Sequence, residues 1–101
     1  MICYVAHSFG GNPNNVERAK KIIHDLQIND LENCYISPLT AFSYLQHKEI
    51  SYDEKMALCL DLLSVCDMLI VASKFGESKG VQMEIEFAHL IGMEVKYLEH
   101  N

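Results

Sequence analysis

The chain has 101 residues, half of them apolar, and a formal net charge of −6. This length suits a single domain over residues 1–101, and the apolar content favours a globular fold over disorder. The acidic balance argues against binding a nucleic-acid backbone by charge, and no apolar stretch reaches the length of a membrane span, so neither nucleic acid nor membrane is an expected partner.

The first half of the chain alternates strand and helix patterns. Residues 2–6 are an apolar run of strand formers, which predicts a strand buried on both faces. A turn-rich loop over 7–15 leads into an amphipathic helix, with Asn14 or Asn15 as the expected N-cap. Residues 34–37 predict a second, weaker strand that Pro38 ends, and residues 39–46 predict an irregular helix.

The second half repeats this alternation. Ser51 and Glu54 form a capping-box pattern, which predicts a long helix to about residue 65. Residues 67–72 are the clearest strand pattern, and a glycine-bearing loop follows over 73–80. A helix to residue 91 and a strand over 95–98 complete the chain, with Gly92 as the helix C-cap. The large apolar side chains of that helix predict its core face: Met83, Phe87, Leu90 and Ile91.

This order of elements predicts a doubly wound α/β fold. Right-handed crossovers give a parallel sheet of about four strands in the order 2-1-3-4, flavodoxin-like or Rossmann-like, with helices on both faces. In this order the chain reverses its direction across the sheet between the first and third strands. A crevice should therefore open at the carboxyl ends of those two strands. The loops over 7–15 and 73–80 flank this crevice and are the expected ligand site.

These two loops supply the candidate binding residues. Glycines let a ligand approach the backbone, and unpaired amides at a helix N-terminus can hold a phosphate or a sugar hydroxyl. The alternative for the first loop is an ordinary polar turn between a strand and a helix. The candidates are His7, Ser8, Phe9, Gly10 and Gly11 in the first loop, and Ser78 and Gly80 in the second.

Glu84 is the candidate catalytic residue. It lies near the start of the last helix, at the border of the predicted core face, and shares a side with Gly80 and Ala88. A carboxylate at this end of the sheet can attack an anomeric carbon or accept a hydrogen bond from a ribose hydroxyl. Alternatively, Glu84 and Glu86 only complement the helix dipole, an effect of about 0.3–1 kcal/mol.

The cysteines form no CxxC pair and lie within apolar runs, which predicts reduced, buried thiols. No Cys/His spacing supports a zinc site, and we expect neither a metal nor another cofactor. Because the start of the chain shows no secretory signal, we expect a cytoplasmic protein. The four thiols are those of Cys3, Cys34, Cys59 and Cys66.

Several motifs, in their order and spacing, resemble the nucleoside 2-deoxyribosyltransferases, specifically their short, uncharacterised and often phage-encoded relatives. The resemblance implies the doubly wound fold, a pocket for a small-molecule nucleoside or nucleotide, and a homodimer or higher homo-oligomer. The long helix has apolar positions around much of its girth, so it is either the interface of this oligomer or simply well buried. The matching segments cover nearly the whole chain: residues 4–11 (YVAHSFGG), 37–40 (SPLT), 66–71 (CDMLIV) and 78–80 (SKG), followed by Glu84, Ala88, Gly92 and Val95.

The resemblance also implies a role for Glu84. In these transferases a helix glutamate attacks the sugar C1′ to form a glycosyl-enzyme, and Glu84 falls on that position. Two residues depart from the family pattern. Glu86 replaces a glycine, and Cys59 replaces the aspartate expected to act as general acid/base for the departing base. The resemblance therefore implies an N-glycosyl hydrolase or deoxyribosyltransferase, or else a non-catalytic protein that sequesters a nucleotide-derived ligand.

Overall fold

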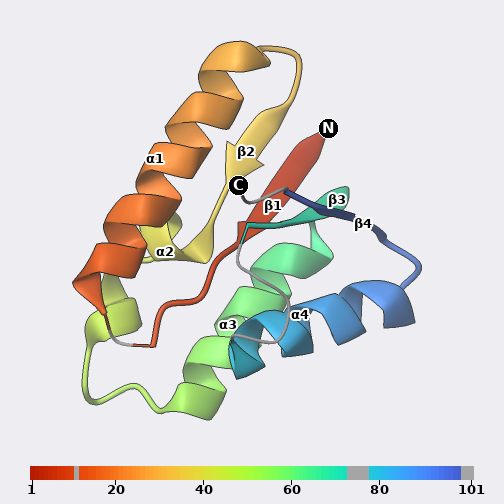
Figure 1. Ribbon diagram of the computed structural model, residues 1–101. Helices are drawn as coiled ribbons and strands as arrows, with labels where there is room; N and C mark the ends of the chain where they lie inside the picture. Colours follow the sequence, from red (N-terminus) through yellow and green to blue (C-terminus); the bar gives the residue numbers. More distant parts are fainter. Residues whose placement is uncertain (11, 73–77, 99–101) are drawn as a thin grey trace.

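Four parallel strands form a single sheet in the order β2-β1-β3-β4 (Figure 1). The structure, a computed structural model, describes residues 1–10, 12–72 and 78–98. The strands are β1 (Ile2–Ala6), β2 (Cys34–Ile36), β3 (Met68–Val71) and β4 (Glu94–Tyr97). The α/β fold class and the strand order predicted from the sequence are confirmed.

The central strands β1 and β3 carry the core. β1 pairs with β2 through Ile2 and Cys34, and with β3 through Cys3 and Met68. Residues 3–6 and 68–72 are all buried, as expected for inner strands of a parallel sheet covered on both faces. Cys34 is exposed on the edge strand β2, so the prediction of buried cysteines is wrong at this position.

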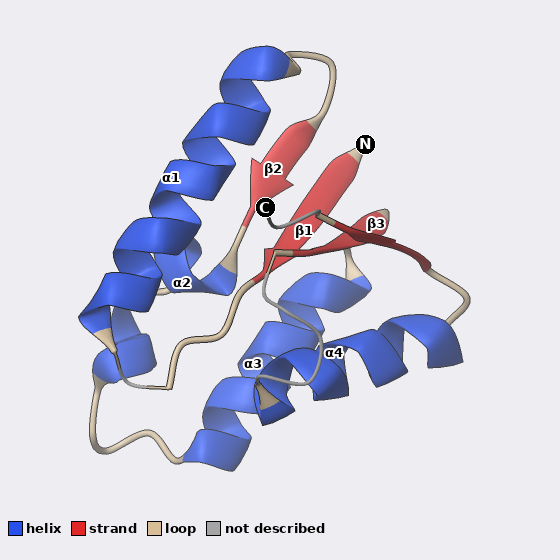
Figure 2. Ribbon diagram, in the orientation of Figure 1, coloured by secondary structure: helices blue, strands red, loops and turns tan. Residues whose placement is uncertain are grey.

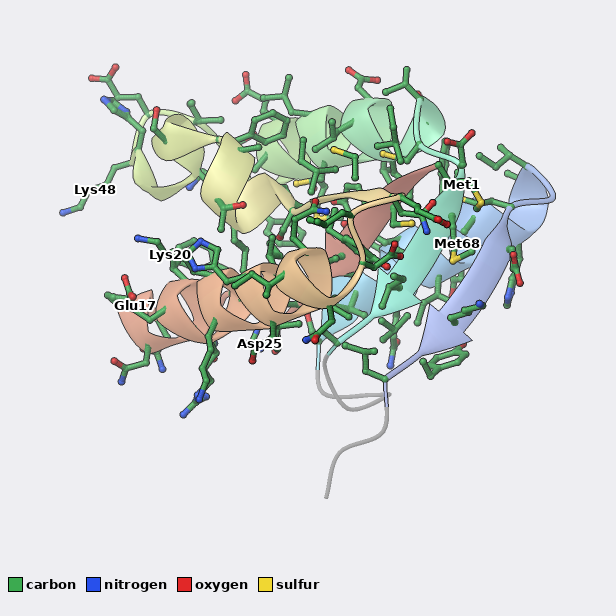
Figure 3. The ribbon with its side chains drawn as sticks, turned by 90° about the horizontal axis from the view of Figure 1, so that it is seen from above. Met1, Glu17, Lys20, Asp25, Lys48 and Met68 are labelled. Carbon is green, nitrogen blue, oxygen red and sulfur yellow. The ribbon has the colours of Figure 1, made fainter. Side chains whose placement is uncertain are left out.

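Helices cover both faces of the sheet (Figures 2 and 3). On one face, α1 (Pro13–Asn29) packs Ile23 against Val5 and Ile70. On the other face, α3 (Tyr52–Ser64) and α4 (Lys79–Leu90) pack Leu63 and Ile85 against the sheet. The short helix α2 (Pro38–Ala41) and the 3-10 turn η1 (Ser43–Gln46) lie where the sequence predicted one irregular helix. No helix among the described residues has the length and apolarity needed to cross a membrane.

The helix starts show which local signals the fold uses. The capping box of α3 is present: Ser51 Oγ accepts the Glu54 N–H (3.1 Å), and Glu54 Oε1 accepts the Ser51 N–H (3.0 Å). The helix α1 begins earlier than predicted, with Asn12 as its N-cap and Pro13 at its first position. Proline suits that position because its φ is already helical and its missing N–H has no helical partner to lose.

The N-cap of α3 gives a stability prediction. Replacing Ser51 by alanine removes the side-chain partner of the Glu54 amide, so we expect the free energy of unfolding to fall by about 1 kcal/mol. Urea denaturation measures this change. The matched control is Ser64→Ala, because the exposed Ser64 hydroxyl only donates to the Asp61 carbonyl in the last turn. Equal losses in the two variants would contradict a specific capping role.

The buried face of α4 differs from the prediction. Its buried residues are Val81, Glu84, Ile85 and Ala88, whereas Leu90 is 83% exposed. The prediction weighted the largest apolar side chains, but a helix approaches a sheet most closely through small residues such as Ala88. Glu84 therefore lies within the buried face and not at its border. The candidate site therefore contains a buried carboxyl group and not a partly exposed one.

Candidate functional site

A cavity of about 1040 Å³ opens at the carboxyl ends of β1, β2 and β3. The residues that follow these strands line it, namely His7 after β1, Pro38 after β2 and Ala72 after β3. Figure 1 shows that the N-terminal ends of α1, α3 and α4 gather on the same side of the sheet. The cavity occupies the point where the strand order reverses. Its volume lies at the upper end of the range typical of small-molecule sites, which is about 300–1,000 Å³.

The structure brings the described parts of the two predicted loops together at this cavity, and residues 73–77 of the second loop lie outside the described residues. Seven of the eight predicted site residues line it. Gly11, the eighth, lies outside the described residues. The seven are His7, Ser8, Phe9 and Gly10 from the first loop, Ser78 and Gly80 from the start of α4, and Glu84.

Glu84 is a buried carboxyl group on the wall of the cavity. Its side chain is 5% exposed, and the hydroxyl of the fully buried Tyr4 donates a hydrogen bond to Glu84 Oε2. Burial raises the pKa of Glu84 to about 7, although the hydrogen bond from Tyr4 acts in the opposite direction. Near neutral pH this carboxyl is therefore present in both protonation states, so that a part of it is available as the carboxylate.

Cys59 completes this buried cluster. Its thiol contacts the Tyr4 hydroxyl, so Tyr4 lies between the thiol and the Glu84 carboxyl. Burial, together with the charge of Glu84, raises the pKa of Cys59 to about 11. The thiol therefore stays protonated at neutral pH and is a poor nucleophile. In this cluster Glu84 is the group that can ionise under ordinary conditions.

Residues 1–97 match a protein family that is described as a domain of unknown function, DUF4406. The chain belongs to this family. Neither a curated protein nor a solved structure matches it. Within the described part of this DUF4406 domain, no three His, Cys, Asp or Glu side chains group as metal ligands would. The cavity and its buried carboxyl are therefore the observations from which a function can be inferred.

The two helix N-termini at the cavity of the DUF4406 domain are not equivalent. In α1 the Asn14 amide donates to Asn12 Oδ1 (2.9 Å) and the Asn15 amide donates to the Asn12 carbonyl (3.0 Å). Pro13 has no N–H, so the start of α1 offers no amide over residues 13–15, contrary to the prediction for this loop. In α4 the Ser78 Oγ accepts the third amide, that of Val81 (3.3 Å), and the first two amides have no partner within the helix.

Gly80 has a packing role as well as a place in the cavity wall. A Cβ at this position would lie 3.3 Å from Met56 Sδ and 3.5 Å from Tyr52 Oη. Glycine therefore lets the start of α4 approach α3 closely. This approach brings Ser78 and the first amides of α4 to the same cavity as the residues of α3.

Sequence reasoning missed the contributions of α1 and α3 to the cavity. Tyr4 could have been found, because a tyrosine hydroxyl in a buried strand needs a hydrogen-bond partner. Glu86, a departure from the transferase pattern, is exposed and does not line the cavity, so it does not crowd the site. The missed lining residues include Arg18, Tyr52, Lys55 and Met56.

Proposed function

We propose that this protein binds a nucleoside or nucleotide and cleaves its N-glycosidic bond, with Glu84 as the nucleophile. The observation that carries the proposal is a buried carboxyl group, hydrogen-bonded by Tyr4, on the wall of a cavity large enough for such a ligand. The resemblance of the sequence to nucleoside 2-deoxyribosyltransferases agrees with this assignment. The activity would be that of an N-glycosyl hydrolase or a deoxyribosyltransferase.

The proposed reaction has two steps. The Glu84 carboxylate attacks C1′, a C–O bond forms, and the C–N bond breaks with its electron pair leaving on the base, which takes a proton from solvent. Water then attacks C1′ of the glycosyl ester in a hydrolase, or a second base attacks it in a transferase; the C–O bond to Glu84 breaks, its electron pair leaves with the carboxylate, and the proton of the attacking group passes to solvent. Because the attacking form is the carboxylate, the rate of the first step should rise as the pH passes through about 7.

The start of α4 would hold the other end of the sugar. Gly80 and Glu84 lie four residues apart on the same side of the helix, a rise of about 6 Å. This separation is comparable to the span of a pentose from its 5-phosphate to its anomeric carbon. Ser78 and the first amides of α4 would thus bind a phosphate or hydroxyl group while Glu84 reaches C1′. Phe9 would offer an aromatic surface to the sugar or the base.

Incubation of the protein with a broad panel of nucleosides and nucleotides tests this proposal. We expect chromatography to detect free base from at least one compound, and we expect no base after Glu84 is replaced. A panel without any turnover would contradict the enzymatic proposal.

A second candidate function is non-catalytic binding or sequestration of a nucleotide-derived ligand. Cys59 favours it, because the related transferases carry an aspartate there and a thiol with a raised pKa is a weak proton donor. In that case ligands would raise the melting temperature without being consumed. A panel that gives neither turnover nor a thermal shift would exclude both functions.

A further inference from the structure

The cavity is lined by basic side chains although the chain as a whole is acidic. The sequence holds 14 Asp and Glu residues against 8 Lys and Arg residues. Among the described residues that line the cavity, however, the bases are Arg18, Lys55 and Lys79, and the only acid is the buried Glu84. Among the described residues, three Lys or Arg side chains but a single Asp or Glu side chain therefore lie at this cavity, so its local charge opposes that of the molecule.

The three basic side chains come from three different elements. Arg18 belongs to α1, Lys55 lies near the N-terminal end of α3, and Lys79 is the first residue of α4. Arg18 donates a hydrogen bond to Asn15 Oδ1 (3.1 Å), a neutral amide on the same cavity wall. This contact orients the guanidinium without neutralising its charge. Basic side chains from the helices on both faces of the sheet thus line the cavity.

We infer that the ligand of this site carries a phosphate group, and that Arg18, Lys55 and Lys79 bind its negative charge. The inference rests on the proposed function and narrows its ligand from nucleosides and nucleotides to nucleotides. A neutral nucleoside would gain little from three cations. A phosphate monoester carries close to two negative charges and three acceptor oxygens, which suit a guanidinium, ammonium groups and the first amides of α4.

The basic side chains also offset the electrostatic repulsion between an anionic ligand and the Glu84 carboxylate. An anionic ligand entering a cavity that holds a carboxylate is repelled, and this repulsion is strong where water is excluded. Lys79 at the start of α4 and Lys55 near the start of α3 line the same cavity and would offset this repulsion. The phosphate is therefore expected at the end marked by Lys79, with the sugar lying between it and Glu84.

Calorimetric titration with a matched pair, a 2′-deoxynucleoside and its 5′-monophosphate, tests the inference, with ribose 5-phosphate and inorganic phosphate as further ligands. We expect the monophosphate to bind at least about 100-fold more tightly than the nucleoside, with the difference shrinking as salt is added. Arg18→Gln and Lys55→Gln should each weaken monophosphate binding by about 10-fold, a larger loss than either variant causes in nucleoside binding.

The control variants are Lys20→Gln in α1 and Lys48→Gln, which change the net charge equally. Both side chains are exposed and outside the cavity lining, and Figure 3 shows them projecting from the surface. Equal losses in control and site variants would overturn the inference, because they would show an effect of overall charge.

Two further outcomes separate this inference from the proposed function. Equal affinity for the nucleoside and its monophosphate would overturn the phosphate inference and leave nucleoside cleavage standing. If ribose 5-phosphate or inorganic phosphate binds as tightly as the nucleotide, the phosphate site is supported and nucleotide recognition is contradicted. Absence of binding by every compound would overturn both.

Discussion

Replacing Glu84 by glutamine should abolish turnover and, at the same time, stabilise the folded protein at alkaline pH. Glutamine keeps an oxygen that accepts the Tyr4 hydrogen bond but cannot attack C1′, so we expect base release to fall by at least about 10³-fold. The stability change has the opposite sign because the buried carboxyl resists ionisation. Burial raises its pKa from 4.5 to about 7, and this difference is worth about 3 kcal/mol.

The sign of the pH dependence follows from linkage. Below pH 4.5 the carboxyl is protonated in both the folded and the unfolded chain, so it imposes no penalty. Between pH 4.5 and about 7 only the unfolded chain releases the proton, so the contribution of Glu84 to stability falls as the pH rises. Above about pH 7 the penalty is complete. The glutamine variant lacks this loss and should exceed the wild type by about 3 kcal/mol there.

Urea denaturation at about pH 5 and about pH 9 measures this difference. The matched control is Glu86→Gln, which removes the same charge from an exposed position on the same helix. We expect the control to change the free energy of unfolding by less than about 0.5 kcal/mol at both pH values. A Glu84→Gln variant that is less stable than the wild type at both pH values would show that the ionised carboxylate supports the fold, which is the reverse of our account.

Cys59→Asp should destabilise the protein strongly at neutral and alkaline pH. Cys59 is buried, and its side chain lies in the cluster with Tyr4 and Glu84. A carboxyl group there loses hydration and faces a second carboxyl group, and both effects raise the pKa values of the pair. Because an uncompensated buried charge typically costs about 3–5 kcal/mol, we expect a loss of about 3 kcal/mol or more above neutral pH.

Cys59→Asn is the matched control, since it has the same shape and no charge. The difference between the two variants in free energy of unfolding should grow from near zero at about pH 4 to its full value above neutral pH. Equal stability of the two variants at alkaline pH would mean that water from the cavity hydrates position 59. The burial of this position would then not explain why it holds a cysteine and not an aspartate. A gain of base release in the aspartate variant alone would support the general acid/base role that the resemblance implies.

The fold was predictable from the sequence because each element carries a local signal. The Ser51–Glu54 box, the Ser78 cap and Gly92 mark helix ends, and apolar runs mark the inner strands. Right-handed crossovers then leave few possible strand orders. The start of α1 was misplaced because Asn12, Asn14 and Asn15 are all acceptable caps by composition, and only the position of Pro13 distinguishes them.

The candidate site was predictable only in outline. The position of the two loops follows from topology, and the structure places their described residues at the cavity. The burial of Glu84 does not follow, because hydrophobic patterns assign a charged residue to the exposed side of a helix. Its partner Tyr4 lies on another element far away in sequence, as do the cations Arg18 and Lys55. Such groups meet only through tertiary packing.

The central position of β1 determines when this protein can assemble during synthesis. The strand made first pairs on one side with Cys34–Ile36 and on the other with Met68–Val71, so its sheet neighbours emerge from the ribosome much later. The wall that carries Glu84 follows later still. A nascent chain that stops before β3 therefore presents an apolar strand with an unpaired edge, which makes the early chain a natural client for chaperones.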